Sequence, residues 1–407
     1  MERLMKALAD HETSRKRAIN MIASENRTSP LVRMMMASDL AHRYSDELYG
    51  GSIHARQIIE ACEKILQQLF RAEHVLVTPL SGNFAVLSAV LGLTKPGGVV
   101  AKVRGEDGGY PLNIEAFQRS ALWLHFDPSA RSIDIDASRA ELLARPPALV
   151  MLGQSVFTHP HPVTEMRELI DRHSLKCPLV FDGSHVLGLI AGGEFQDPLR
   201  QGADVLLGST HKTFFGPQGG VVLSNDRGVF RKIAKYGGFT QGSHSLVDNM
   251  HLHRVAGLAV AGLELLEFGK QYASQVVKNS KALASHLHEA GIPVIKGAGG
   301  FTCSHQVLLD YSRQEAFKIK SKLEGIGIMT DVLLRIGTSE STRLGMKEPD
   351  MKQIAGIIAS AIKDERDRAS LQTEVEEISG RFQTVQYTFD VSAFPTAMAL
   401  IKSYFPF

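Results

Sequence analysis

The residues around Lys212 have types and spacing that suit chemistry on a carbonyl group. Lys212 follows an apolar run, stands in the sequence G-S-T-H-K-T and precedes a glycine-rich turn. Desolvation in such a place favours the neutral amine, the form that makes a Schiff base. The hydroxyl groups of Ser209 and Thr210 can donate hydrogen bonds to phosphate oxygens. A lysine that extends from a loop into water has the same local sequence, so this interpretation also stays open.

A carboxylate ends another apolar run, C-P-L-V-F-D, at Asp182. Ligands of open α/β sheets bind at the carboxyl ends of the strands, which is where Asp182 would lie. Pyridoxal phosphate needs a carboxylate against its pyridine nitrogen, because the protonated ring is the electron sink. The alternatives are a helix N-cap for Asp182 and a buried, hydrogen-bonded histidine for His185, three residues later.

A possible anion site lies in the sequence T-P-L-S-G-N at residues 78–83, between a strand-like run and a helical run. Free backbone N–H groups at the start of a helix bind anions, and the Ser81 hydroxyl adds a donor. Gly82 and Asn83 complete this candidate phosphate site. An ordinary serine or asparagine cap would give the same sequence.

Short apolar runs alternate with helical segments from about residue 57 onward. Several runs are apolar without alternation, which is typical of strands buried on both faces. Strands that alternate with helices predict a mostly parallel α/β sheet. The strand-like runs are 73–79, 97–103, 148–153, 177–182, 203–209 and 219–224, and helices are predicted over 1–20 and 84–93.

The second part of the chain has a different order of elements. A helix-rich stretch over 254–290 is followed by strand-like and helical segments in the order of an α+β domain. We therefore expect an N-terminal arm over 1–30, a large α/β domain over 31–275 and a smaller α+β domain over 276–407.

Composition excludes several classes of protein. The 407 residues include 45 Lys and Arg against 43 Asp and Glu, and a net charge of only +2 argues against nucleic acid as a partner. The hydrophobic share of 44% is ample for a core. The three cysteines have no paired spacing, so neither a disulfide framework nor a metal site is expected. No apolar run is long enough to span a membrane and the charged start is no secretory signal, so we expect a cytoplasmic protein.

In order, the motifs of the chain resemble those of the serine hydroxymethyltransferase family of fold-type I pyridoxal-phosphate enzymes. This resemblance implies an aspartate aminotransferase-like fold with a mostly parallel seven-stranded sheet, pyridoxal 5'-phosphate as cofactor and a homodimer with shared active sites. The matching motifs are I-A-S-E-N at 22–26, Y-G-G at 49–51, S-G at 81–82, F-D-G-S-H at 181–185, T-H-K-T at 210–213 and L-R-I-G-T at 334–338.

The resemblance also implies roles for single residues. Lys212 would form the internal aldimine and Asp182 would pair with the pyridine nitrogen. Arg335 would bind the substrate carboxylate through a bidentate pair, with a surface ion pair as its alternative role. The substrate end would be lined by Ser24, Tyr44 and Tyr49, with the tyrosines donated by a partner subunit. The expected cofactor contacts are Ser81, Gly82, Asn83, Ser155, Asp182, His185, Ser209, Thr210, Lys212 and, from a partner subunit, Gly238.

The sequence departs from the family pattern mainly on elements that face folate. Asp46 stands where the family has glutamate, and the loop that normally precedes Tyr49 is missing. The A-H-G-G-H segment reads E-D-G-G-Y, so no histidine remains there to stack on the ring, and either Tyr110 stacks instead or the stacking is lost. Gln218 replaces the arginine of a Gly-Pro-Arg-Gly-Gly turn, and the Asn- and Pro-rich stretch before Arg335 is absent.

These departures make the chain similar to the folate-independent branch of the superfamily, the L-threonine transaldolases. We expect retro-aldol and aldol chemistry on serine or threonine, which gives glycine plus an aldehyde or a transfer to another aldehyde. The alternatives are a folate-dependent hydroxymethyltransferase, an aminotransferase on the same fold, and a partner-binding protein without catalysis. The expected catalytic residues are Lys212, Asp182, Asp46, Tyr44 and His211.

Overall fold

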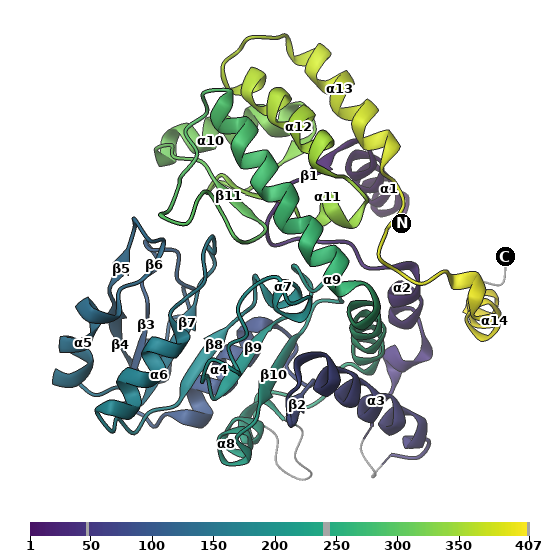
Figure 1. The fold of residues 1–407 in the computed structure, drawn as a ribbon. Coiled ribbons are helices and arrows are strands. Elements are labelled where there is room, and N and C mark those ends of the chain that lie inside the picture. The colour runs from purple at the N-terminus through teal and green to yellow at the C-terminus, as the bar shows by residue number, and fades with distance from the viewer. Residues whose placement is uncertain (46–48, 239–244, 405–407) are drawn as a thin grey trace. The chain divides into compact units, whose positions relative to one another are not determined.

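The computed structural model describes residues 1–45, 49–238 and 245–404. The chain forms two compact units (Figure 1). The larger unit comprises Thr28–Lys270 and Thr388–Phe407, and the smaller unit comprises Met1–Arg27 and Gln271–Tyr387. The long helix α9 (Leu252–Glu289) contributes residues to both units.

The larger unit is built on a seven-stranded sheet with the strand order β2-β10-β9-β8-β7-β3-β4. All neighbours from β9 to β4 are parallel, while β10 is antiparallel to both β9 and β2. The predicted mostly parallel sheet is therefore confirmed. Its strands are β2 (His74–Leu76), β3 (Val99–Val103), β4 (Ser120–Leu124), β7 (Leu149–Gly153), β8 (Leu179–Asp182), β9 (Val205–Ser209) and β10 (Gly220–Ser224).

Strand β4 is the one that the apolar runs did not predict. It lies at the edge of the sheet and pairs with β3 alone. Only Leu122 and Leu124 of its residues are buried, whereas all five residues of β7 are buried. An edge strand with one face partly exposed does not need the continuous apolar run by which the central strands were found.

Helices cover the sheet and are held by caps and apolar faces. Helix α4 (Gly82–Leu93) begins at Ser81, whose side chain accepts a hydrogen bond from the backbone of Phe84, and its buried residues share a core with the sheet. No helix in the described part of the chain is long and apolar enough to cross a membrane. The other helices of this unit are α2 (Pro30–Met36), α3 (Ile53–Phe70), α5 (Ile135–Ala144), α6 (Val163–Arg172), α7 (Leu187–Ala191), α8 (Arg227–Gly237) and α14 (Pro395–Tyr404).

The smaller unit is an α+β structure with two short sheets. Strand β1 (Ile19–Asn20) pairs in parallel with β12 (Ile328–Met329), and β11 (Gln306–Leu308) pairs antiparallel to β13 (Arg335–Gly337). Helices pack around one apolar core that includes Ile19, Ile328 and Ile336. The helices that contribute residues to this core are α10 (Arg313–Gly325), α12 (Glu348–Ile362), α13 (Arg368–Arg381) and the C-terminal part of α9. The unit also contains α1 (Glu2–Arg17), which has no buried residue, and α11 (Ser339–Arg343).

The two units differ from the expected division at both ends of the chain. The N-terminal residues are part of the smaller unit rather than a separate arm, because Ile19 and Met21 are buried in its core. Residues 388–407 belong to the larger unit, where Ala397 packs with Leu31 and Met34.

Candidate active site

Several expected site residues lie at the carboxyl ends of adjacent parallel strands. Asp182 is the last residue of β8 and is in register with Gly153, the last residue of β7. A Cβ atom at position 153 would lie 2.2 Å from the carbonyl oxygen of Asp182, so only glycine fits there. Ser209 ends the neighbouring strand β9, and Lys212 follows it. The sheet thus brings Asp182, Ser209 and the lysine segment together at the carboxyl ends of its parallel strands.

Asp182 is a buried carboxylate held by its own turn. Its Oδ1 accepts hydrogen bonds from the hydroxyl of Ser184 at 2.6 Å and from the backbone N–H of Ser184 at 3.0 Å. Burial raises the pKa of Asp182, and the Ser184 bonds and the charges of Lys212 and Lys102 offset this only in part. A buried carboxylate of this kind gains from a cation placed against it, such as a protonated pyridine nitrogen.

The loop that carries Lys212 is fastened to the segment that follows Asp182. The hydroxyl of Thr213 donates a hydrogen bond to the carbonyl oxygen of His185 at 2.9 Å and accepts one from the N–H of Gly188 at 3.0 Å. His185 itself is buried. These two bonds fix the lysine loop to the end of β8, and therefore to Asp182.

His211 is a neutral imidazole at pH 7. Burial, followed by the charge of Lys212, lowers the pKa of His211 to about 4. Its Nδ1 is buried and has no hydrogen-bond partner within the described structure. The side chain is therefore a neutral imidazole next to Lys212, with one N–H donor and one acceptor nitrogen.

The start of α4 forms a close cradle with the ends of β9 and β10. A Cβ atom at Gly82 would lie 3.0 Å from Cβ and Oγ of Ser209, and one at Gly220 would lie 2.3 Å from the carbonyl oxygen of Ser81. The glycines let the backbone of residues 81–82 meet the Ser209 side chain directly. A helix N-terminus beside two serine side chains suits a phosphate.

Two of the expected phosphate contacts have other partners in the structure. The hydroxyl of Thr210 is fully buried and donates a hydrogen bond to the carbonyl oxygen of Pro217 at 2.6 Å. Asn83 accepts a hydrogen bond through Oδ1 from the hydroxyl of Tyr110 at 3.0 Å. Thr210 thus closes the glycine-rich turn, and Asn83 holds the tyrosine that replaces the stacking histidine.

A small cavity beside Asp182 is lined in part by Lys102 and Tyr110. Nζ of Lys102 donates a hydrogen bond to the carbonyl oxygen of Tyr110 at 2.9 Å, and burial lowers the pKa of Lys102. The backbone N–H of Ser155 donates to the carbonyl oxygen of Gly108 at 2.7 Å. The loop before Tyr110 is therefore fixed from two sides at this edge of the sheet.

In the smaller unit, Arg335 is fixed by a neighbouring carboxylate. Oδ2 of Asp331 contacts Nη2 of Arg335 at 2.9 Å and Nε at 3.1 Å. Oδ1 of Asp331 accepts the backbone N–H groups of Leu333 at 3.0 Å and Arg335 at 3.2 Å. Because the Arg335 side chain is only 9% exposed, this pair sets the direction of its guanidinium.

Ser24 lies in the segment that packs along the strand beginning at Arg335. The backbone N–H of Gly337 donates to the carbonyl oxygen of Met21 at 2.7 Å, and Nε2 of His305 lies 3.1 Å from the carbonyl oxygen of Ala23. The smaller unit therefore brings together two of the expected substrate-binding segments.

Three of the expected site residues, Tyr44, Tyr49 and Gly238, were expected to act in the site of a partner subunit, and the structure describes their surroundings in a single chain. The rings of Tyr44 and Tyr49 stack with centroids 4.7 Å apart, and their exposed fractions are 43% and 49%. Gly238 is buried at the end of α8 and donates its N–H to the carbonyl oxygen of Ala234. Asp46 lies outside the described residues.

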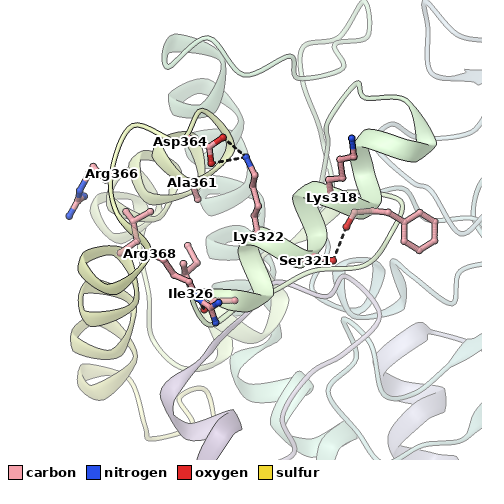
Figure 2. Close-up of a pocket in the computed structure, with 11 residues that line it drawn as sticks. Lys318, Ser321, Lys322, Ile326, Ala361, Asp364, Arg366 and Arg368 are labelled. Carbon is pink, nitrogen blue, oxygen red and sulfur yellow. Dashed lines mark hydrogen bonds and ion pairs between the residues drawn. The ribbon is translucent and has the colours of Figure 1, made fainter.

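A cavity of about 760 Å³ opens between α10, α12 and α13 of the smaller unit (Figure 2). Its lining residues include none of the expected site residues. Lys322 is paired there with Asp364 at 2.7 Å, and Nε of Arg368 donates to the carbonyl oxygen of Gly325 at 2.8 Å. Over the whole described part of the chain, no group of three or more His, Cys, Asp or Glu residues could hold a metal ion.

Comparisons with known proteins agree with this geometry. A sequence model of the family described as serine hydroxymethyltransferase matches residues 1–358. Serine hydroxymethyltransferase of Methanopyrus kandleri is 38% identical, over 95% of this chain and 94% of that protein. The chain belongs to the serine hydroxymethyltransferase family. The enzyme of the same name from Methanocaldococcus jannaschii is also 38% identical, over 94% of each chain.

A solved structure of an enzyme with a different name has the same fold. L-threonine transaldolase from Pseudomonas fluorescens, in the internal aldimine state, superposes with a TM-score of 0.89 and 27% identity over 99% of this chain and 96% of that chain. The present member of the serine hydroxymethyltransferase family is therefore a fold-type I, pyridoxal-phosphate-dependent transferase.

The residues present fit that cofactor. Asp182 is a buried carboxylate that gains from a ring cation, and the charge of Lys212 acts on it from the neighbouring strand end. At the cradle, the backbone of Gly82 lies directly against the Ser209 side chain, so the helix N-terminus and the serine hydroxyls lie together, which suits a phosphate.

Some residues of this site were not predicted from the sequence. Ser184 stands inside the F-D-G-S-H motif but had no role, and Lys102 is a single cation within the apolar run V-V-A-K-V. Asp331 lies in the short segment before Arg335, which the sequence marks only by the absence of the Asn- and Pro-rich stretch. A lone charge in an apolar run was the available signal for Lys102; the roles of Ser184 and Asp331 depend on contacts.

Proposed function

We propose that this enzyme makes and breaks the Cα–Cβ bond of a β-hydroxy amino acid without tetrahydrofolate. Serine or threonine would give glycine plus an aldehyde, or the glycine unit would pass to another aldehyde. The observation that carries the proposal is the buried carboxylate of Asp182 at the end of β8, which feels the charge of Lys212 from the segment that follows the adjacent strand β9. That pair suits chemistry in which electrons are left on the α-carbon of an amino acid.

Pyridoxal phosphate, when bound, supplies a sink for the electron pair that remains on Cα when the aldehyde leaves. Asp182 would hold a proton at the ring nitrogen of the cofactor. Lys212 would provide the amine that binds and releases the carbonyl carbon of the cofactor. Arg335, fixed by Asp331, would bind the substrate carboxylate. His211, as a neutral imidazole, would accept the β-hydroxyl proton, and Asp46 and Glu47 are the other candidates from the sequence.

Folate independence is supported by the connection that leads to Arg335. Strand β12 ends at Met329 and β13 begins at Arg335, so residues 330–334 form the whole connection. Within it, the Asp331 carboxylate is occupied by Arg335 and two backbone N–H groups. The structural similarity to a threonine transaldolase points the same way, whereas the names of the curated relatives favour folate-dependent hydroxymethyl transfer as the second candidate.

The test is an incubation of the holoenzyme with L-serine and, separately, with L-threonine, with and without tetrahydrofolate. Glycine and the released aldehyde are measured, and a second aldehyde is added to detect transfer. Folate-free cleavage or exchange of threonine would support the proposal, with Lys212→Ala as the inactive control. Strict dependence on tetrahydrofolate would establish the second candidate, and a keto-acid product would indicate an aminotransferase.

We also propose a homodimer in which the tyrosines complete the site of the partner subunit. Tyr44 and Tyr49 stack on each other and present both rings at the surface, as aromatic residues at interfaces do. Sedimentation would give the mass of a dimer. Mixed dimers of Tyr49→Ala and Lys212→Ala chains should regain up to a quarter of the activity if each site uses residues of both chains, and none if each site uses one chain.

A further inference from the structure

Arg254 is a buried cation without a carboxylate partner in the described structure. It lies in the first turn of α9 and is 3% exposed. Its Nη2 donates to the carbonyl oxygens of Val77 at 2.7 Å, Met250 at 3.0 Å and Thr78 at 3.3 Å. Its Nε and Nη1 are buried and have no hydrogen-bond partner among the described residues. A buried guanidinium without a counter-ion is costly, so we expect an anion to bind near it.

The guanidinium touches both segments that form the cradle at the start of α4. The segment that begins at Val77 and Thr78 leads directly to Ser81 and the helix N-terminus. On the other side, a Cβ atom at Gly219 would lie 2.5 Å from Nη1 of Arg254. The next residue, Gly220, is the one that packs against Ser81. Arg254 therefore joins the two walls of the cradle.

The charge balance of the cradle also calls for this residue. A phosphate carries a charge of about −1.5 to −2, while a helix N-terminus offers roughly half a positive charge. Burial lowers the pKa of Arg254 to about 10, which leaves it charged at pH 7. The nearby thiol of Cys62 does not neutralise it, because burial raises the pKa of Cys62. Gln218, in the position where the family pattern has arginine, brings no charge to the same turn.

We propose that Arg254 is the positioning residue of the phosphate site, which holds the two walls of the cradle and supplies its buried positive charge. The identity of the anion as the phosphate of pyridoxal phosphate rests on the proposed function. The role of Arg254 as the counter-charge of an anion at the start of α4 rests on the contacts above.

The experiment uses the full-length chain freed of cofactor and compares Arg254→Met with the wild type. The unfolding temperature is measured with and without inorganic phosphate, and the dissociation constants of pyridoxal phosphate and pyridoxal are measured by absorbance. We expect the wild type, but not Arg254→Met, to be stabilised by inorganic phosphate. Arg254→Met should bind pyridoxal phosphate about tenfold more weakly, and its affinity for pyridoxal should be unchanged. A tenfold loss of affinity is smaller than the usual cost of removing one partner of a buried charge pair.

Arg119→Met is the matched control. Arg119 is also buried in the larger unit and bonds to the carbonyl oxygens of Thr94 and Phe117, so its loss reports purely structural damage. It should lower the unfolding temperature but leave the phosphate response intact. Should Arg254→Met not fold, Arg254→Lys and Arg254→Gln test the same point, with only the lysine variant keeping the response.

Four outcomes decide between the claims. A normal phosphate response in Arg254→Met, or an equal loss of pyridoxal and pyridoxal phosphate, would overturn the role of Arg254 alone. Loss of the phosphate response in Arg119→Met as well would also overturn it. A wild type that binds neither pyridoxal phosphate nor inorganic phosphate would overturn the proposed function together with this inference.

Discussion

The hydroxyl of Ser184 connects the carboxylate of Asp182 to the neighbouring strand. It donates a hydrogen bond of 2.6 Å to Oδ1 of Asp182 and accepts one of 3.1 Å from the backbone N–H of Ser209. Ser209 ends β9 and leads into the lysine segment. The position of Asp182 is therefore set by the end of β9, which is the same strand end from which the Lys212 segment begins.

We predict that Asp182→Asn makes the cofactor-free protein more stable and the holoenzyme inactive. Burial raises the pKa of Asp182 above its ordinary value of 3.8, so stability that is present below that value is lost as pH rises through the folded pKa. At pH 7 the charged carboxylate therefore costs stability, and asparagine at this position should raise the free energy of unfolding. Urea unfolding of the cofactor-free chains and cofactor absorbance measure the two effects.

Ser184→Ala provides the opposite variant for that test. It removes the hydroxyl bond that lowers the pKa of Asp182, together with the link from that hydroxyl to the backbone N–H of Ser209, and should destabilise the cofactor-free protein at pH 7. If Asp182→Asn instead lowered stability as much as Ser184→Ala, the carboxylate would be a structural anchor rather than a strained functional group.

We predict that Asp331→Asn raises the KM for the amino acid about fivefold with kcat changed less than twofold. The freed Arg335 side chain would have to be ordered at each binding event, at a cost of about 0.5–1.5 kcal/mol. Asp350→Asn is the matched control, since Asp350 also accepts a backbone N–H, that of Lys347, and lies 3.7 Å from an arginine, Arg381. A lower KM in Asp331→Asn would show that Asp331 competes with the substrate.

We predict that Gly220→Ala weakens the binding of pyridoxal phosphate at least tenfold, whereas Gly356→Ala does not. A methyl group at position 220 would lie 2.3 Å from the carbonyl oxygen of Ser81 and would push the cradle apart. Position 356 in α12 has open space around an added Cβ, so alanine there should stabilise the helix by about 1 kcal/mol. Cofactor titration and thermal unfolding separate the two results; equal affinities would contradict the assigned cradle.

We predict that the protein loses stability steadily as pH falls from 6.5 towards 4. Burial lowers the pKa of His161 to about 3, and its Nδ1 accepts the backbone N–H of Gly153 at 3.3 Å. Because the folded pKa lies below the ordinary value of 6.5, stability is complete above 6.5 and is lost as pH falls towards the folded pKa. Urea midpoints measured from pH 7 to pH 4 test this, and His161→Gln should give a flatter profile.

The central strands could be predicted because burial on both faces leaves a plain signal. Every residue of L-V-M-L-G in β7 and of V-L-L-G-S in β9 is buried, so the sequence shows uninterrupted apolar runs that end in small residues. In β4 the buried positions alternate with half-buried ones, and that pattern was lost among the surrounding polar residues. The membership of residues 1–27 and 388–407 in the two units depends on contacts distant in sequence, which no local pattern reports.

The chemistry of the site was predicted where a motif joins a reactive side chain to a strand end, as for Lys212 and Asp182. Arg254 and Asp331 were not predicted, because each is defined by what surrounds it. Arg254 reads as an ordinary cation at the start of a helix until its buried and unpaired atoms are known. Asp331 reads as a loop residue until its carboxylate is seen to accept four donors.

The way each unit is closed by distant segments has a consequence for folding during synthesis. The pairing of β1 with β12 joins residues 19–20 to residues 328–329, and Ala397 packs with Leu31 and Met34. A ribosome-bound chain that contains only the first 270 residues would therefore lack β12, the partner of β1, and Ala397, which packs against α2. We expect slow maturation and dependence on chaperones, because contacts of such large sequence separation form late.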